Sequence, residues 1–387
     1  MSQSLHDVLI IGAGPVGASL ALALADADLD LVVLDAREAR GRGVGERSLA
    51  LSHGARLLLE RLGVWTELAA EPRALTSIRE IDVSQVDGFG TARLSAEDVG
   101  LPALGYVVSY SALQSVLDAA LVRHGVSVCH ATVAETVGAT HAYAAVTCAG
   151  MPDALLGRLV VRADGVGAAT PSLKRRRHDY GQCAVLASVG TRAPHDGVAF
   201  ERFTDEGPLA LLPEQDGYAL VWTTSSARVE ALLALSDAGF LEALRRRVGV
   251  RRNDFLTVGQ RRSFPLTLDF ARDAVGTRCA LIGNAAQALH PVAAQGLSLG
   301  LRDAHQLART IVDTPQSEIG SADMLARYAR SRRYDRGAGI AVTHALASVF
   351  ASPAGWMRLP RGVGLAMLDA LPFARRQFTR SMLYGLR

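Results

Sequence analysis

A glycine-rich turn near the N-terminus constrains the fold more than any other stretch of this chain. Residues 7–11 (DVLII) form a continuous apolar run, which is typical of a buried parallel strand. The turn GAGPVG follows directly, and residues 18–27 continue as an apolar helix pattern. Gly12 permits the tight turn, Gly14 lets the backbone approach a pyrophosphate, and Gly17 lets the helix pack on the strand. The stretch therefore predicts a strand–turn–helix unit with an anion site at the helix N-terminus.

A second strand and an acidic residue complete this pattern. Residues 31–34 form the strand, and Asp35 ends it eighteen residues after Gly17. A carboxylate at this place can accept hydrogen bonds from the hydroxyls of an adenosine ribose. The pattern predicts a dinucleotide-binding unit, although it does not distinguish NAD from FAD. The predicted contacts in this unit are Gly12, Gly14, Pro15, Val16, Gly17 and Asp35.

Length and composition narrow the class of protein. With 387 residues, of which 49% are hydrophobic, the chain can bury the cores of two domains. A net charge of +3 is too small to predict binding to nucleic acid, and no nucleic-acid motif is present. The four cysteines form no C-x-x-C pair and do not cluster with histidine, so we expect reduced thiols, no metal site and a cytoplasmic protein.

A second strand–loop–helix pattern lies at residues 279–304. Residues 279–282 form an apolar strand that stops at Gly283, and a loop with His290 follows. Ser298 is the expected N-cap of the next helix. Backbone N–H groups and the helix dipole would favour negative charge at this loop, such as that on the N1 edge of a reduced flavin. An ordinary strand–helix connection is the alternative.

Three segments together resemble the aromatic-ring flavoprotein monooxygenases, the family typified by p-hydroxybenzoate hydroxylase. They are GAGPVG with Asp35, the Asp164-Gly165 pair after a strand, and the loop at 283–298. Within that family the chain is most similar to the 2-polyprenyl-6-methoxyphenol hydroxylases of ubiquinone biosynthesis. The stretches that carry this similarity are 46–52 (ERSLALS), 199–204 (AFERFT), 207–210 (GPLA), 262–266 (RSFPL) and 283–286 (GNAA).

The chain departs from the wider family's pattern at a few positions. Ala294 replaces a usual glycine of the flavin loop, and Ser298 replaces a usual asparagine. Ala168 and Pro171 stand where serine and arginine are usual, which puts in doubt a nicotinamide-binding role for that segment. None of these changes removes a group that the oxygen chemistry requires.

The resemblance implies an α/β fold, in which a Rossmann-like FAD-binding domain is interrupted by a smaller substrate domain with a mainly antiparallel sheet, and helices follow at the C-terminus. The expected FAD-binding domain is discontinuous and comprises residues 1–75, 99–182 and 263–337. The expected substrate domain comprises residues 76–98 and 183–262, and the C-terminal helical segment comprises residues 338–387.

The resemblance also implies a reaction. NADPH or NADH would reduce FAD, O₂ would form a C4a-hydroperoxyflavin, and the ring of a polyprenylated methoxyphenol would be hydroxylated. Pro291, Gln295 and Gly296 would position the flavin. No acid–base residue is assigned, and we expect His290 to pack or hydrogen-bond behind the loop.

Further cofactor contacts come from the same resemblance. A surface arginine and a helix-surface glutamine are the alternatives for Arg47 and Gln114. The implied contacts outside the fingerprint are Arg47, Gln114, Asp164, Gly165, Gly283, Asn284, Pro291, Gln295, Gly296, Leu297 and Ser298.

Residues 183–262 carry strands with a period of two and clear turn signals. Residues 209–212 and 218–222 flank an Asp-Gly turn and predict a hairpin. The inward face of this sheet would form the floor of a ring-binding pocket, and Phe203, Leu211 and Trp222 are the candidates for substrate contact. Core packing is the alternative for each of the three.

The last fifty residues concentrate positive charge. They carry six arginines against Asp369 and are rich in Leu, Val, Met and Phe. This composition suits docking on the inner surface of an anionic membrane, where a polyprenyl substrate would reside, or a helical cap on the cofactor domain. The two roles are compatible. Other substrates for the same flavin chemistry, and a flavin-binding scaffold among ubiquinone-biosynthesis proteins, remain as alternative functions.

Overall fold

The computed structural model describes most of the chain. The described residues are 4–38, 47–86, 88–166, 173–249, 254–291, 295–350 and 358–385. Four positions raised above lie outside these ranges: Glu46, Ala168, Pro171 and Ala294.

The first of the two large sheets has eight strands and is built around parallel pairs. Its order is β18-β19-β11-β1-β2-β8, and β10 and β9 extend it from β11. The pairs of β1 with β2 and β11, of β11 with β19, and of β2 with β8 are all parallel. The strands are β1 (Leu5–Ile11), β2 (Leu31–Leu34), β8 (Ser127–Cys129), β9 (Ala134–Ala139), β10 (Ala144–Cys148), β11 (Leu155–Arg162), β18 (Val275–Gly276) and β19 (Cys279–Leu281).

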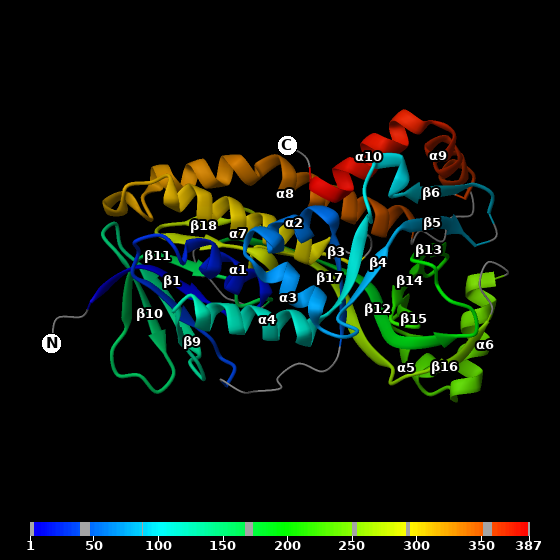
Figure 1. Ribbon diagram of the computed structural model, residues 1–387, viewed down its shortest axis with the longest axis horizontal. Helices are drawn as coiled ribbons and strands as arrows, with labels where there is room; N and C mark the ends of the chain where they lie inside the picture. Colours follow the sequence, from blue (N-terminus) through cyan, green and yellow to red (C-terminus); the bar gives the residue numbers. More distant parts are fainter. Residues whose placement is uncertain are drawn as a thin grey trace.

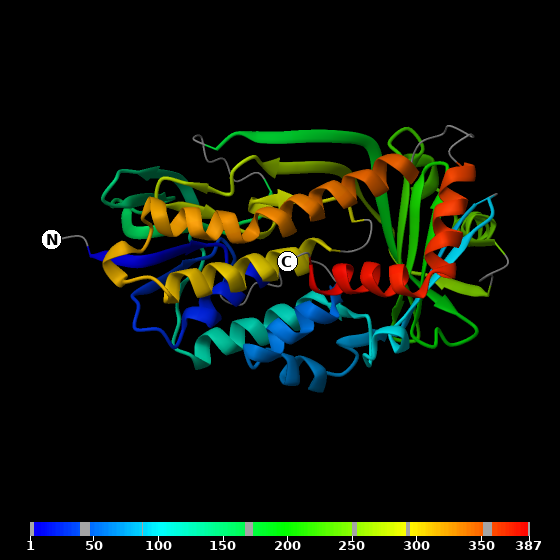
Figure 2. The ribbon, with the colours of Figure 1, turned by 90° about the horizontal axis from the view of Figure 1, so that it is seen from above.

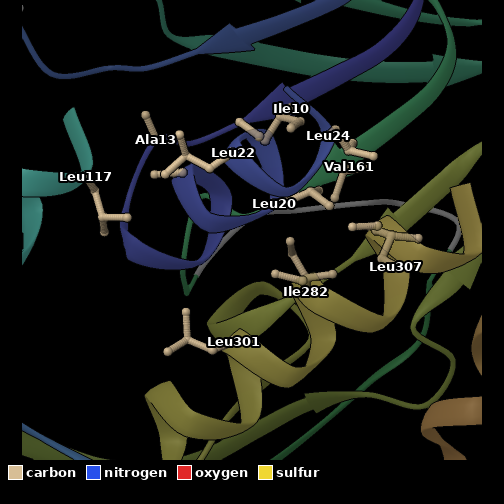
Figure 3. Close-up of a cluster of buried hydrophobic side chains, with 14 of the residues drawn as sticks. Ile10, Ala13, Leu20, Leu22, Leu24, Leu117, Val161, Ile282, Leu301 and Leu307 are labelled. Carbon is tan, nitrogen blue, oxygen red and sulfur yellow. The ribbon is translucent and has the colours of Figure 1, made fainter. Parts of the chain in front are cut away.

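Helices cover this sheet because its central strands are apolar on both faces. α1 (Pro15–Leu24) packs against both α4 (Tyr110–Arg123) and α7 (Gly296–Val312), and all three helices contribute to the largest buried cluster. Figure 3 shows Leu20 and Leu24 of α1 and Leu301 and Leu307 of α7 in this cluster, together with Ile10 of β1. The continuous apolar runs in the sequence thus become strands buried on two sides.

The second large sheet has nine strands and is mainly antiparallel (Figure 1). Its order is β20-β17-β12-β15-β14-β13-β5-β6, with β16 paired to β12. The predicted hairpin is β14–β15. The strands are β5 (Glu80–Gln85), β6 (Thr91–Ser95), β12 (Arg175–Thr191), β13 (Val198–Thr204), β14 (Gly207–Glu214), β15 (Gly217–Ser225), β16 (Phe255–Val258), β17 (Arg262–Ala271) and β20 (Gln287–Ala288).

Sheet membership differs from the expected division of the chain at β12, β17 and β20. β12 is a single strand of 17 residues, and β17 pairs along most of its length. The nine-stranded sheet therefore includes residues 175–182 and 263–271, which the expected FAD-binding domain contains. The domain limits themselves stay a prediction.

A small third sheet has the order β3 (Ser48–Ser52), β7 (Gly105–Ser109) and β4 (Leu75–Ile78), and β5 and β6 of the nine-stranded sheet lie between its strands β4 and β7 in the sequence. α2 (His53–Arg61) and α3 (Val64–Ala70) follow β3 directly. On the far side of the nine-stranded sheet, α5 (Val229–Leu233) and α6 (Asp237–Val248) cover a second core that includes Phe240 and Leu244.

Three helices form the C-terminal part of the described chain. α8 (Ala322–Phe350) begins before the C-terminal helical segment expected at residues 338–387 and packs along α7 (Figure 2). α9 (Arg358–Ala370) packs on β6, and α10 (Pro372–Tyr384) returns to α2. No helix among the described residues combines the length and apolar character needed to cross a bilayer.

Candidate functional site

Three parallel strands end side by side and bring three distant motifs together. β1 leads into Gly12, β11 leads into Asp164, and β19 leads into Gly283. Since the carboxyl ends of parallel strands meet at one edge, residues separated by more than a hundred positions in sequence share one site. This edge is the place where open α/β sheets bind their ligands.

The three fingerprint glycines serve different purposes. Gly12 has φ +99°, and a Cβ there would lie 2.8 Å from the Ala163 carbonyl oxygen. A Cβ on Gly17 would lie 1.9 Å from the Gly12 carbonyl oxygen, so Gly17 is required by the packing of α1 on the turn. A Cβ on Gly14 would meet no atom within 4 Å, and Gly14 lines the cavity described below. The open space over Gly14 fits the close approach of a pyrophosphate.

Asp35 lies at the end of β2, and its neighbour Arg37 was not predicted from the sequence as part of the site. The Asp35 carboxylate is buried, and Arg37 contacts it at 2.6 Å. Arg37 also donates to the Ala13 carbonyl oxygen at 3.0 Å. Burial would lower the pKa of the Arg37 guanidinium, but the hydrogen bond and charge of Asp35 raise it overall. Arg37 therefore ties the acid at the end of β2 to the fingerprint turn.

The Asp164-Gly165 pair lies beside the fingerprint. Arg162 donates to the Asp164 carboxylate at 2.6 Å, and the Arg162 side chain is buried. Gly165 has φ +85°, a left-handed conformation that favours glycine. Both residues of the pair line the cavity.

The N-terminus of α7 closes the site from the other side. Pro291, Gln295, Gly296, Leu297 and Ser298 all line the cavity. The first turn of α7 has backbone N–H groups with no partner inside the helix, so its positive end faces the cavity. The Gln295 side chain donates to the Met382 carbonyl oxygen at 3.2 Å, which joins this loop to α10.

The prediction that Ser298 caps α7 is wrong. The helix begins at Gly296, and Gln295 occupies the N-cap position without a side-chain cap. Ser298 is buried in the first turn, where its Oγ accepts a hydrogen bond from the Ser52 N–H at 3.1 Å. The Ser298 hydroxyl therefore bonds to β3 and not to the backbone of its own helix.

A buried ionic network supports the Gly283-Asn284 turn. The Gly283 N–H donates to Asp303 at 3.2 Å, and Arg332 pairs with the same carboxylate at 2.8 Å. Arg332 also contacts Asp335 at 2.6 Å. Gly283 packs against Val16 and does not line the cavity, whereas the exposed Asn284 does. The network lies behind the site and fixes the end of β19 against α7.

Arg47 and Gln114 have different surroundings. Arg47 lines the cavity, and its guanidinium lies 4.2 Å from the centre of the Tyr110 ring. Gln114 is buried and donates to the Ala13 carbonyl oxygen at 2.9 Å without lining the cavity. Gln114 is therefore placed to hold the fingerprint turn from behind.

One cavity of about 1260 Å³ connects this edge with the nine-stranded sheet. It exceeds the range of roughly 300–1,000 Å³ that is usual for a single small ligand. The end at the fingerprint and α7 is here called the nucleotide end, and the end at the nine-stranded sheet the sheet end. The volume can therefore hold a dinucleotide's ring system and a second molecule next to it.

Most strands line the sheet end with alternate residues, whereas β13 also contributes Phe200 between Ala199 and Glu201. Phe203 faces the cavity, as do Leu212 and Val221. Leu211 and Trp222 do not line it, because they occupy the opposite face and pack with Phe240 in the second core. For these two candidates the core-packing alternative holds, and the prediction of a pocket-facing position is wrong.

Two titratable groups in the cavity have strongly altered pKa values. Glu201 on β13 lines the sheet end, and burial raises the pKa of its carboxyl to about 7. His290 lines the nucleotide end, packs edge-on to Tyr180, and burial lowers its pKa to about 4. Glu201 was missed at the sequence level. The signal was present in AFERFT, where period two puts one acid between Ala199 and Phe203.

The site combines a glycine fingerprint, a parallel sheet whose strands come from distant parts of the chain, and a second loop at the end of a parallel strand. These features define a flavoprotein of the Rossmann-like class. The family described as "FAD binding domain" matches residues 6–338 of the chain. The chain belongs to this family, so the cofactor expected from the sequence is confirmed as FAD.

Similar proteins agree with the resemblance found in the sequence. The chain is 32% identical to "Ubiquinone hydroxylase UbiL" of Rhodospirillum rubrum, over 100% of this chain and 91% of the relative. It is 28% identical to the "3-demethoxyubiquinol 3-hydroxylase" of Escherichia coli, over 87% of each. The p-nitrophenol 4-monooxygenase PnpA of Pseudomonas putida superposes with a TM-score of 0.77 at 18% identity, covering 100% of both chains, which shows a shared fold. The recognition of the family and the α/β fold class are confirmed.

Proposed function

We propose that this protein is an FAD-dependent monooxygenase that hydroxylates the ring of a polyprenylated methoxyphenol in ubiquinone biosynthesis, with NADPH or NADH as electron donor. The observation that carries the proposal is the single cavity that joins the FAD fingerprint to an apolar sheet wall. The names of the similar proteins supply the class of reaction and substrate.

The residues at the nucleotide end fit FAD. Gly14 leaves the backbone open to the pyrophosphate, and Asp35 offers a buried carboxylate for the ribose. The N-terminus of α7, with Pro291, Gln295 and Gly296 before and within its first turn, would face the flavin's N1 edge. When bound, FAD supplies the electron transfer and oxygen activation that no side chain can provide.

The chain's own contribution is orientation and exclusion of water. The first turn of α7 supplies positive potential where the reduced ring system carries negative charge. The sheet end excludes water with apolar side chains such as Phe203, Leu212 and Val221. An electron-rich ring bound there would lie between this wall and the cofactor.

The test begins with the absorbance spectrum of the purified protein. The spectrum should show oxidised flavin, and anaerobic NADPH or NADH should bleach it faster when a short-tailed 2-prenyl-6-methoxyphenol is present. In air the phenol should gain one oxygen atom from isotopically labelled O₂. A colourless protein that takes up no FAD, or a yellow one that leaves the phenol unchanged, would contradict the proposal.

We also propose that α9 and α10 dock on an anionic membrane surface. Leu359, Val363 and Met367 follow each other at intervals of four on α9 and are exposed. Leu365 and Leu368, on the other face of the same helix, line the cavity. A helix that is apolar on both faces can pass a prenyl tail from the bilayer to the cavity.

The neighbouring helix adds the charge that such a surface attracts. Phe373, Arg376 and Arg380 are exposed and share one face of α10, since they are spaced by three and four residues. Basic residues near an anionic surface contribute about 1 kcal/mol each. The apolar residues would enter the lipid, and the arginines would remain among the head groups.

Vesicle sedimentation tests this docking. The double variant Leu359→Ser/Phe373→Ser should bind phosphatidylglycerol vesicles at least about tenfold more weakly than the wild type, because each side chain loses part of a transfer energy of about 1.5–3 kcal/mol. Val122→Ser is the matched control, because Val122 is 79% exposed on α4, away from this surface. Equal binding by the double variant and the wild type would rule out the docking surface.

A further inference from the structure

Glu201 is an isolated carboxyl group on an apolar wall. Among the described residues of the nine-stranded sheet that line the cavity, it is the only one with a polar side chain. Its neighbours across the sheet are Val83 on β5 and Ala210 on β14. Ala199 and Phe203 lie two residues before and after it on the same strand and also line the cavity.

The carboxyl group has no partner within the part of the chain that the structure describes. Its Oε1 is buried and accepts no hydrogen bond. The charged or titratable side chains elsewhere on the lining are His290, Arg361, Arg47 and Tyr110, besides the Asp35–Arg37 and Asp164–Arg162 pairs. Burying a carboxyl without a partner is costly, so a protein that keeps one in a ligand cavity has a use for it.

We propose that Glu201 recognises the ring hydroxyl of the phenolic substrate by accepting its hydrogen bond and then, during hydroxylation, its proton. This inference rests on the proposed function and names the residue that selects a phenol over other rings. A phenolic O–H donates, and a carboxylate is the strongest acceptor among the side chains. Across the apolar wall of the cavity, no other described side chain of the sheet can make that bond.

The proton step balances within the substrate and this side chain. As the ring accepts an oxygen atom it loses electron density, and its hydroxyl becomes more acidic. The O–H bond of the phenol breaks, its electron pair stays on the ring oxygen, and a new O–H bond forms on Glu201. The raised pKa of the carboxyl, about 7, brings it nearer to that of a phenol, which is about 10 for tyrosine.

The test compares two ligands that differ only in this hydroxyl. The probes are 2-methoxy-6-prenylphenol and its O-methyl ether, each titrated into the FAD-loaded protein and followed by the flavin absorbance. The wild type should bind the phenol about 10–100-fold more tightly than the ether, as expected for a hydrogen bond to a charged acceptor. In Glu201→Leu the two affinities should agree within about threefold.

A conservative variant separates recognition from packing. Glu201→Gln keeps a carbonyl acceptor and should retain an intermediate preference for the phenol, while its rate of hydroxylation falls because it cannot take the proton. Glu242→Gln is the control, because Glu242 is exposed on α6, which covers the far side of the nine-stranded sheet. A loss of packing alone would weaken both ligands equally in every variant.

The outcomes distinguish this inference from the proposed function. If Glu201→Leu keeps the wild-type preference, or if the wild type shows none, the assignment of Glu201 is overturned while the flavoprotein and its substrate class stand. If the flavin-loaded wild type binds neither probe, the proposed substrate class fails, and the inference falls with it.

Discussion

At the nucleotide end of the cavity, backbone groups of the glycine turn and of α7 form much of the wall beside side chains such as Asp35, whereas the sheet end is lined by side chains. Gly12 and Gly17 are required at the first end because a Cβ on either would clash with the backbone, and Gly14 leaves open space there. At the second end, alternation along β13 and β14 decides whether a side chain faces the cavity or the second core. A site built from backbone groups requires glycines at fixed positions, and these form a motif that can be recognised in the sequence. A wall of side chains requires only a period of two along each strand, and this period does not identify the residues that face the cavity.

The largest effect should appear at the nucleotide end, where two neighbouring glycines differ in purpose. Gly17→Ala should lower the free energy of unfolding of the FAD-free protein by about 3–5 kcal/mol, because its Cβ would lie 1.9 Å from a backbone oxygen. Gly14→Ala should stay within about 1 kcal/mol of the wild type but bind FAD at least about tenfold more weakly. Urea unfolding and FAD titration measure the two quantities. Equal losses of stability in both variants would contradict this division.

A pair of neighbouring variants can test the sheet end in the same way. Leu211→Ala should cost about 2–5 kcal/mol, because Leu211 is fully buried in the second core. Leu212→Ala, one residue further on, should cost about 1 kcal/mol and instead change the affinity for a phenolic ligand, because Leu212 lines the cavity. Urea unfolding and ligand titration test both. A reversed order of the two stabilities would mean that the strand presents its other face.

A smaller effect should follow from the titration of His290 at the nucleotide end. Burial holds the pKa of His290 at about 4 in the folded protein, below its ordinary value of about 6.5. The unfolded chain therefore takes up the proton first, and stability is lost as the pH falls from about 6.5 to 4, by about 2–3 kcal/mol. His290→Asn should flatten this acid limb in urea unfolding. An unchanged slope would show that other groups control it.

The smallest effect should have the opposite sign, at the sheet end. Burial raises the pKa of Glu201 from its ordinary value of about 4.5 to about 7, so the folded protein holds the proton more tightly than the unfolded chain. Stability is then lost as the pH rises through this window, by about 1–2 kcal/mol because the side chain is only half-buried. Glu201→Gln should gain on the wild type between pH 5 and pH 8. A constant difference between the two proteins over that range would contradict the buried titration.

Much of the nucleotide end could be predicted because its parts are local. The turn from Gly12 to Gly17, the strand at 31–34 and the Asp35 position all depend on spacing within a few dozen residues. Arg37 was not predicted because its contact with Ala13, 24 residues earlier in the chain, exists only after β1 and β2 pair. The helix start at Gly296 escaped notice because Ser298 has the right residue type for a cap but uses its hydroxyl on Ser52.

The sheet end was predicted less well. The hairpin of β14 and β15 is strong in sequence, yet period two does not say which of its two faces meets a cavity. Leu211 and Trp222 look as suitable for a pocket floor as Phe203 does, and α6 decides against them by covering their face. Glu201 is one acid among many in the sequence, and only its apolar neighbours on the two adjacent strands, β5 and β14, make it unusual.

By itself, the sequence determined the dinucleotide-binding fingerprint, because that motif rests on the short-range spacing of glycines and apolar runs. The family, and with it the class of fold and FAD, followed from the resemblance of several stretches spread along the chain. Only the tertiary structure decided which side chains meet in the cavity and which carboxyl lies alone on its wall. The physical reason is that burial and charge are properties of surroundings. The surroundings of Glu201 and His290 come from strands and helices far apart in the chain, which only packing brings together.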